Sequence, residues 1–158
     1  MMFIEGVAQP LKHWLAAAPT HSGNDPHEHA DRIVGEGQSL RVLIVEDEFF
    51  ISLDTKALLE ALGHTVVGIA VSADQAVDAA ERDRPDVVLM DIRLVGSRDG
   101  IEAAKEIQVR CGIGSIFVTA NTDPHTRHRA QGVQPLAILE KPLTQQRLRE
   151  AFRFVKQE

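Results

Sequence analysis

Strict alternation of two kinds of segment between residue 40 and the end of the chain constrains the fold more than any other feature. Short apolar runs, expected as strands, cover 40–46, 65–70, 86–91, 115–120 and 136–139. Longer segments between and after them, expected as helices, cover 48–62, 73–83, 99–110, 123–132 and the residues from 144 onward. Such alternation predicts a parallel sheet with helices on both faces and right-handed crossovers.

Five strand–helix units of this kind predict an α/β flavodoxin-like (βα)5 doubly wound sheet with strand order 2-1-3-4-5. The first helix carries apolar residues three and four positions apart, which predicts one apolar stripe along it: Phe50, Leu53, Ala57 and Ala61. Gly63 is placed to end that helix, and Ser72 to cap the next. In such a sheet the functional site lies beyond the carboxyl ends of the strands, at the switch point between strands 1 and 3.

Reactive side chains stand at those predicted strand ends. Glu46 and Asp47 end the first strand and Asp91 ends the third. Thr119 ends the fourth, and Lys141 follows the fifth. Because parallel strands deliver their carboxyl ends to one edge of the sheet, the topology gathers these five residues on one rim.

Their chemistry is coherent. Three neighbouring carboxylates repel one another, and a hard divalent cation such as Mg²⁺ relieves that repulsion while binding a phosphate oxygen. One carboxylate can act as a nucleophile and form an acyl phosphate. Lys141 then offers a fixed positive charge and Thr119 a hydroxyl for the phosphoryl oxygens, which suits phosphoryl transfer by positioning and charge neutralisation.

Four motifs in order resemble the receiver domain of two-component response regulators. They are "VEDE" at 45–48, "PDVVLMDIRL" at 85–94, "VTA" at 118–120 and "EKP" at 140–142. The resemblance covers about Leu40 to Lys156 and implies a signalling phosphoprotein rather than an enzyme. It implies that Mg²⁺, or Mn²⁺ in its place, is the cofactor. The implied phosphoryl donor is a phosphohistidine on a sensor histidine kinase or phosphotransfer protein.

The same resemblance implies a role for each site residue. Asp91 is the phospho-acceptor and a metal ligand, Asp47 binds the metal directly, and Glu46 binds it through water. The backbone carbonyl of Arg93 completes the protein ligands. Thr119 is the switch hydroxyl, Lys141 contacts the phosphoryl group, and a cis bond between Lys141 and Pro142 aims the lysine.

Two positions depart from the family's common pattern. Ile138 stands where many receivers carry a tyrosine or phenylalanine as a rotamer switch, and isoleucine has no ring to swing between buried and exposed states. The loop after Asp91 is about one residue longer than the commonest version and has Val95 near the usual proline. Arg93, long and cationic beside the acceptor, is expected to reach the phosphoryl group or a nearby acid and so to modulate dephosphorylation.

Composition excludes several other classes. The chain has 158 residues, a net charge of −6 and one cysteine, so broad nucleic-acid binding and intrachain disulfides are not expected. No apolar run is long enough to span a membrane. The amino terminus, with Glu5 and no early basic residue, differs from a secretory signal, which favours a cytoplasmic location.

Residues 1–39 form an arm or linker outside the receiver match, which we take as 40–158. Within the arm, 10–18 carries apolar residues at helical spacing and predicts a short helix with the chain's one tryptophan. That helix is expected either to pack across a partner subunit, giving a homodimer, or against a partner protein; the alternative is a tail that folds weakly on its own domain. Since neither end is long enough for an effector domain, we expect a stand-alone receiver that acts through a downstream protein.

Three other interpretations of the rim compete with this one. Acids at strand ends are often simply solvated, but Asp91, Thr119 and Lys141 all in register argue against that. A haloacid-dehalogenase-like phosphatase would have a second acid where this chain has Arg93. A pseudo-receiver, acting as a phosphorylation-independent binding or dimerisation module, would be expected to lack one of the acids or the lysine.

Overall fold

The structure, a computed structural model, describes residues 38–120 and 123–155. The chain divides between Gly37 and Gln38, and the fold described below belongs to the second part. The predicted helix at 10–18 and its role in dimerisation lie outside the described residues.

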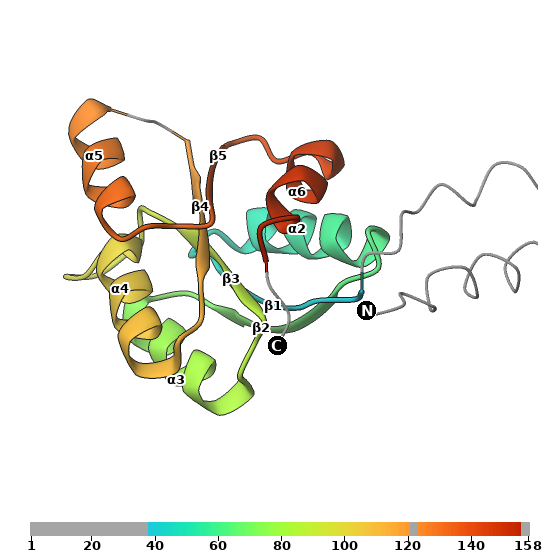
Figure 1. The fold of residues 1–158 in the computed structure, drawn as a ribbon, viewed down its shortest axis with the longest axis horizontal. Helices are drawn as coiled ribbons and strands as arrows, with labels where there is room; N and C mark the ends of the chain where they lie inside the picture. The colour runs from blue at the N-terminus through green and yellow to red at the C-terminus, as the bar shows by residue number, and fades with distance from the viewer. Residues whose placement is uncertain (1–37, 121–122, 156–158) are drawn as a thin grey trace, which may run out of the picture. The chain divides into compact units, whose positions relative to one another are not determined.

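Five parallel strands form one sheet in the order β2-β1-β3-β4-β5, which confirms the predicted topology (Figure 1). The strands are β1 (Arg41–Val45), β2 (Thr65–Ala70), β3 (Val87–Asp91), β4 (Ser115–Thr119) and β5 (Ala137–Glu140). The helices are α2 (Phe49–Ala61), α3 (Ala73–Asp83), α4 (Gly100–Cys111), α5 (Pro124–Gly132) and α6 (Gln145–Phe152).

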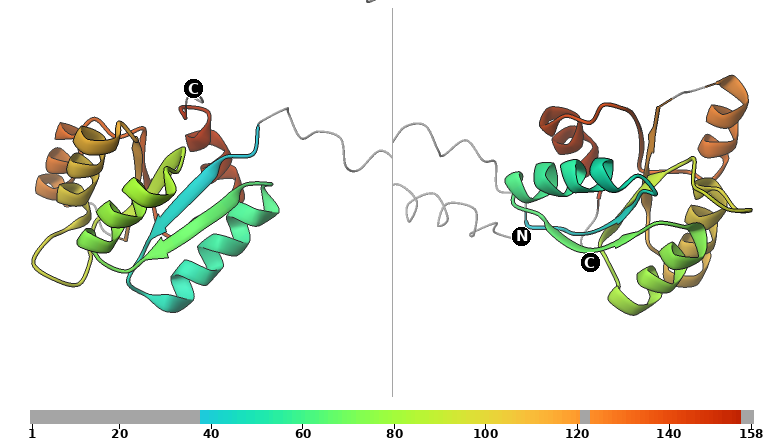
Figure 2. Two further views of the ribbon diagram at one scale, coloured as in Figure 1. Left: turned by 90° about the horizontal axis from the view of Figure 1, so that it is seen from below. Right: turned by 180° about the vertical axis from the view of Figure 1, so that it is seen from behind.

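The sheet separates two helical layers. Helices α2 and α6 lie against one face, and α3, α4 and α5 lie against the other (Figures 1 and 2). The central strands β3 and β4 are buried along their whole length, as their continuous apolar runs predict for strands covered on both sides. Each face has its own apolar core, so the two layers meet only through the sheet.

Local sequence signals set several helix ends. Ser72 and Thr144 accept hydrogen bonds from backbone amides in the first turns of α3 and α6. Asp99 and Glu102 form a reciprocal capping box at the start of α4. Gly63 adopts a φ of 85°, a left-handed conformation that favours glycine, just after the end of α2. The predicted caps at Ser72 and Gly63 are therefore confirmed.

Helix α2 is rotated relative to the predicted apolar stripe. Phe50 is 78% exposed and Leu53 42% exposed, so that stripe faces solvent. The helix packs instead through Ser52, Thr55 and Leu59. The prediction was wrong because spacing alone cannot distinguish two faces when short polar side chains also fit against a sheet. The Ser52 hydroxyl donates to the carbonyl of Phe49 over 2.7 Å, so its burial leaves no donor unsatisfied.

Arginines join the helices on the α4 side of the sheet. Arg98, in the loop before α4, pairs with Asp74 on α3 and with Glu106 on α4. Arg129 on α5 pairs with Asp99, the residue that caps α4, over 2.7 Å. These charged contacts connect the loop that follows Asp91 to all three helices of this layer. Within the described ranges, no helix is long and apolar enough to cross a membrane.

Candidate functional site

The carboxyl ends of the strands bring together the residues that the sequence predicted. Glu46 and Asp47 follow β1, and Asp91 is the last residue of β3. Ligand oxygens of these three residues all lie within 4.8 Å of one another. Thr119, at the end of β4, is 1% exposed, and its carbonyl accepts a 2.9 Å hydrogen bond from the amide of Lys141.

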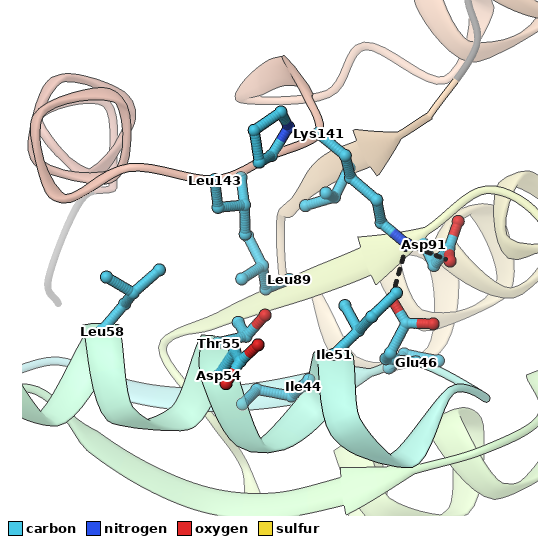
Figure 3. A pocket seen from close by; sticks show the side chains of 13 residues that line it. Ile44, Glu46, Ile51, Asp54, Thr55, Leu58, Leu89, Asp91, Lys141 and Leu143 are labelled. Atoms are coloured by element: carbon cyan, nitrogen blue, oxygen red, sulfur yellow. Dashed lines mark hydrogen bonds and ion pairs between the residues drawn. The ribbon is translucent and has the colours of Figure 1, made fainter.

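Lys141 joins two of the acids (Figure 3). Its Nζ lies 2.7 Å from Glu46 Oε2 and 2.9 Å from Asp91 Oδ2. Burial by itself lowers the pKa of Lys141, but the hydrogen bonds and charges of the two carboxylates outweigh it and raise that pKa overall. The ammonium group is therefore fully charged at neutral pH. The bond between Lys141 and Pro142 is cis, as predicted.

The remaining oxygens of the two acids accept backbone amides. The amide of Glu48 donates to Glu46 Oε1 over 3.1 Å, and the amide of Arg93 donates to Asp91 Oδ1 over 3.0 Å. Burial nevertheless raises the pKa of Glu46 above its ordinary value, and the negative charge of Asp91 adds to this effect. The site thus gathers three carboxyl groups around one lysine.

Gly100 is a site residue that the sequence analysis missed. A Cβ built on Gly100 would lie 1.9 Å from the carbonyl oxygen of Asp91, far closer than any real contact. The amide of Gly100 donates to the carbonyl of Ile92 over 2.9 Å, which holds the start of α4 against the end of β3. The glycine in "SRDGIEAA", at the start of a predicted helix, was the available signal.

The two positions that depart from the common pattern differ in their surroundings. The side chain of Arg93 is exposed beside Asp91, and Val95 in the same loop is 72% exposed. Ile138, in β5, is half-buried and packs against the core on the α3–α4 side. An aliphatic side chain packed in this way has no ring to move between buried and exposed positions.

The donor set suits a hard divalent cation. Three carboxylates contribute oxygen ligands within one small space, and no thiolate or imidazole competes with them among the described residues of that cluster. Mg²⁺ prefers such oxygen ligands, a few from carboxylates and the rest from water and phosphate. Negative charge on the carboxylates around Lys141 would be neutralised by the cation. The residues present therefore fit the metal that the fold implies.

Comparisons with known proteins agree with this geometry. Over 116 residues the chain is 33% identical to the phyllosphere-induced regulator PhyR of Methylorubrum extorquens. The match covers 73% of this chain but only 43% of PhyR. The signal receiver domain of a modulated diguanylate cyclase from Desulfovibrio desulfuricans G20 is 35% identical, with a TM-score of 0.71 and coverage of 74% of this chain and 93% of that one.

A third relative is a solved structure that contains a metal. The receiver domain of the sensor histidine kinase PA1611 from Pseudomonas aeruginosa PAO1, with magnesium coordinated in its active site cleft, is 32% identical. Its TM-score is 0.66, and the match covers 74% of this chain and 98% of that one. A model of the response regulator receiver domain matches residues 42–153. These matches favour signalling over the phosphatase alternative, and the chain belongs to the response regulator receiver-domain family.

Proposed function

We propose that Asp91 accepts a phosphoryl group from a phosphohistidine on a sensor histidine kinase or phosphotransfer protein. One observation carries the proposal: Lys141 Nζ lies 2.9 Å from Asp91 Oδ2, in a cluster that also holds Glu46 and Asp47. A nucleophilic carboxylate, a fixed cation and two further acids are the components that phosphoryl transfer to an aspartate requires.

The transfer is a single displacement at phosphorus. A carboxylate oxygen of Asp91 forms a bond to phosphorus as the bond from phosphorus to the histidine nitrogen breaks, and the electron pair of that bond remains on the imidazole. Oδ1 already accepts the amide of Arg93, which orients the carboxylate for attack. Lys141 moves from the carboxylate pair to a phosphoryl oxygen, and the Thr119 hydroxyl donates to another.

Glu46, Asp47, Asp91 and the backbone carbonyl of Arg93 would hold the Mg²⁺. Bound there, the cation would neutralise charge on the transferring phosphoryl group. Lys141, which contacts both Glu46 and Asp91, places a second positive charge beside the transferring phosphoryl group. The same residues would hold Mn²⁺, which has a similar preference for oxygen ligands.

We infer that the phosphorylated domain signals through contacts with a downstream protein. Receiver domains interact with kinases or phosphotransfer proteins and with partner proteins. Strand β5 leads directly into Lys141, which contacts the acceptor Asp91. With Ile138 in that strand, the response cannot rely on the movement of an aromatic ring. The exposed Arg93 is proposed to contact the phosphoryl group and set its lifetime.

Incubation with acetyl phosphate tests the phosphorylation proposal. With Mg²⁺ present, intact-mass analysis should find one added phosphoryl group, and peptide mapping should locate it at Asp91. Asp91→Asn should abolish the adduct, and Asp86→Asn, a change at the acid just before the opposite end of that strand, should leave it unchanged. A wild-type chain that forms no adduct under these conditions would favour the pseudo-receiver, a binding module independent of phosphorylation.

A further inference from the structure

A cavity of about 380 Å³ lies between helix α2 and the loop that joins β5 to α6, next to the carboxylate site (Figure 3). Its floor is made by apolar side chains of three strands: Ile44, Leu89 and Val118. Leu58 on α2 and Leu143 in the loop form opposite walls. Small-molecule sites are concave, largely apolar spaces of about 300–1,000 Å³, and this cavity is within that range.

The cavity exists because of how α2 meets the sheet. The helix turns Phe50 and Leu53 to solvent and packs through the short side chains of Ser52 and Thr55. Thr55 is one of the cavity-lining residues, and it is too small to fill the space between α2 and the β5–α6 loop. The apolar lining that solvent reaches is made by Ile51, Leu58 and Leu143, which are half-buried above a floor of buried strand side chains.

The cavity is lined by a carboxylate and an ammonium group that differ in whether they have a partner. Asp54 lines it from α2, and within the described part of the chain its carboxylate makes no ion pair or hydrogen bond. Lys141 lines the inner end, but its ammonium is bonded to Glu46 and Asp91. The cavity therefore presents one carboxylate without a partner among the described residues, near the hydroxyl-bearing Thr55 (Figure 3).

We propose that this cavity binds a small amphipathic cation, with its apolar body among Ile51, Leu58 and Leu143 and a protonated amine against Asp54. The apolar lining supplies the hydrophobic contribution to binding, and the Asp54 carboxylate selects positive charge. An anionic molecule of the same shape would be repelled by Asp54 at the wall, and by Glu46 and Asp91 at the end of the cavity nearest the carboxylate site. The concave shape and the depth to buried strand side chains suit a small molecule better than a protein surface.

Three probes of matched shape test this proposal: 4-phenylbutylamine, 4-phenylbutanol and 4-phenylbutanoate. The full chain, labelled at Ile and Leu methyl groups, is titrated with each probe in Mg²⁺-free buffer and followed by NMR. We expect saturable shifts at the methyl groups of Ile51, Leu58 and Leu143, with the amine binding at least about fivefold tighter than the alcohol and the carboxylate weakest. Shifts that do not saturate at these methyl groups, or a carboxylate that binds as tightly as the amine, would overturn the proposal.

Substitutions separate the roles of charge and shape. Asp54→Asn conserves volume and should reduce amine binding to the level of the alcohol. Asp78→Asn, the same change at an exposed acid on α3, should leave all three affinities unchanged. Thr55→Leu should fill the cavity and remove binding of every probe. Because Asp54 is exposed, Asp54→Asn remains informative even where Thr55→Leu does not fold, and an undiminished amine preference in Asp54→Asn contradicts the proposal.

Discussion

The backbone amide of Lys141, one residue beyond the end of β5, donates a 2.9 Å hydrogen bond to the carbonyl of Thr119. This bond extends the pairing of β4 with β5, in which Thr119 stands opposite Glu140. The two residues that we propose to contact the phosphoryl group are therefore held in register by a main-chain hydrogen bond. A substitution at Lys141 can remove its charge while the backbone that positions Thr119 stays in place.

Lys141→Met should lower the free energy of unfolding at pH 7, without Mg²⁺, by roughly 3 kcal/mol, because it leaves two buried carboxylates facing each other without a cation. Burial already raises the pKa of Glu46, and loss of the Lys141 hydrogen bond would raise it further, so the variant's stability is lost as pH rises through that range. Urea unfolding at pH 5 and pH 7 measures both effects, with the larger loss at pH 7.

Lys105→Met is the matched control for that change. Lys105 is exposed on α4 and makes no ion pair within the described ranges, so its replacement should alter the unfolding free energy by less than about 0.5 kcal/mol. If Lys141→Met were as stable as this control at pH 7, the two ion pairs of Lys141 would not hold the site together.

Gly100→Ala should destabilise the protein by about 2 kcal/mol, because the new methyl group overlaps the carbonyl of Asp91 and forces the backbone to shift. The shift also displaces the acceptor, so phosphorylation by acetyl phosphate should fall with it. Gly132→Ala, in α5, has no atom within 4 Å of its added Cβ and should be neutral or slightly stabilising. Equal thermal unfolding temperatures for the two variants would contradict the proposed close approach at Gly100.

His64 should make the folded protein less stable in mild acid. Its Nδ1 accepts the amide of Leu40 over 3.2 Å, its ring contacts that of Phe152, and burial lowers its pKa from the ordinary 6.5. Because the unfolded chain then binds more protons than the folded one, the unfolding free energy should fall as pH drops from about 7.5 to 5.5. His64→Gln should flatten this dependence in urea unfolding, and His125→Gln, an exposed site on α5, should not. An unchanged slope in His64→Gln would assign the effect to other groups.

Arg93→Ala should shorten the half-life of phosphorylated Asp91 roughly fivefold, through loss of one charge-assisted hydrogen bond to the phosphoryl group. Arg93→Lys keeps the charge and should lie between wild type and the alanine variant. Loss of radiolabel from the purified phosphoprotein measures the half-life. A half-life in Arg93→Ala that equals that of wild type would rule out a role for this side chain.

The site was predictable from sequence where topology alone determines position. Asp91 and Lys141 lie 50 residues apart in the chain, yet each stands at the end of an apolar run, and parallel strands place such ends together. The caps at Ser72 and Gly63 were predictable for a related reason, since a local backbone requirement is met by a few residue types.

Features that depend on packing between distant segments were not predictable. The buried face of α2 includes Ser52 and Thr55. Their polar side chains predict exposure from sequence, and only their position over the sheet shows that they are buried. The close approach of Gly100 to Asp91, and the cavity beside Thr55, likewise arise from distances that no periodicity encodes.

Asp99 uses both carboxylate oxygens, one to cap α4 through the amide of Glu102 and the other to bind Arg129 on α5. Asp99 also ends the loop that begins at Asp91, so any displacement of this loop must either lengthen the contact with Arg129 or move α5 with it. The acceptor loop therefore has a direct contact with α5 that does not pass through position 138.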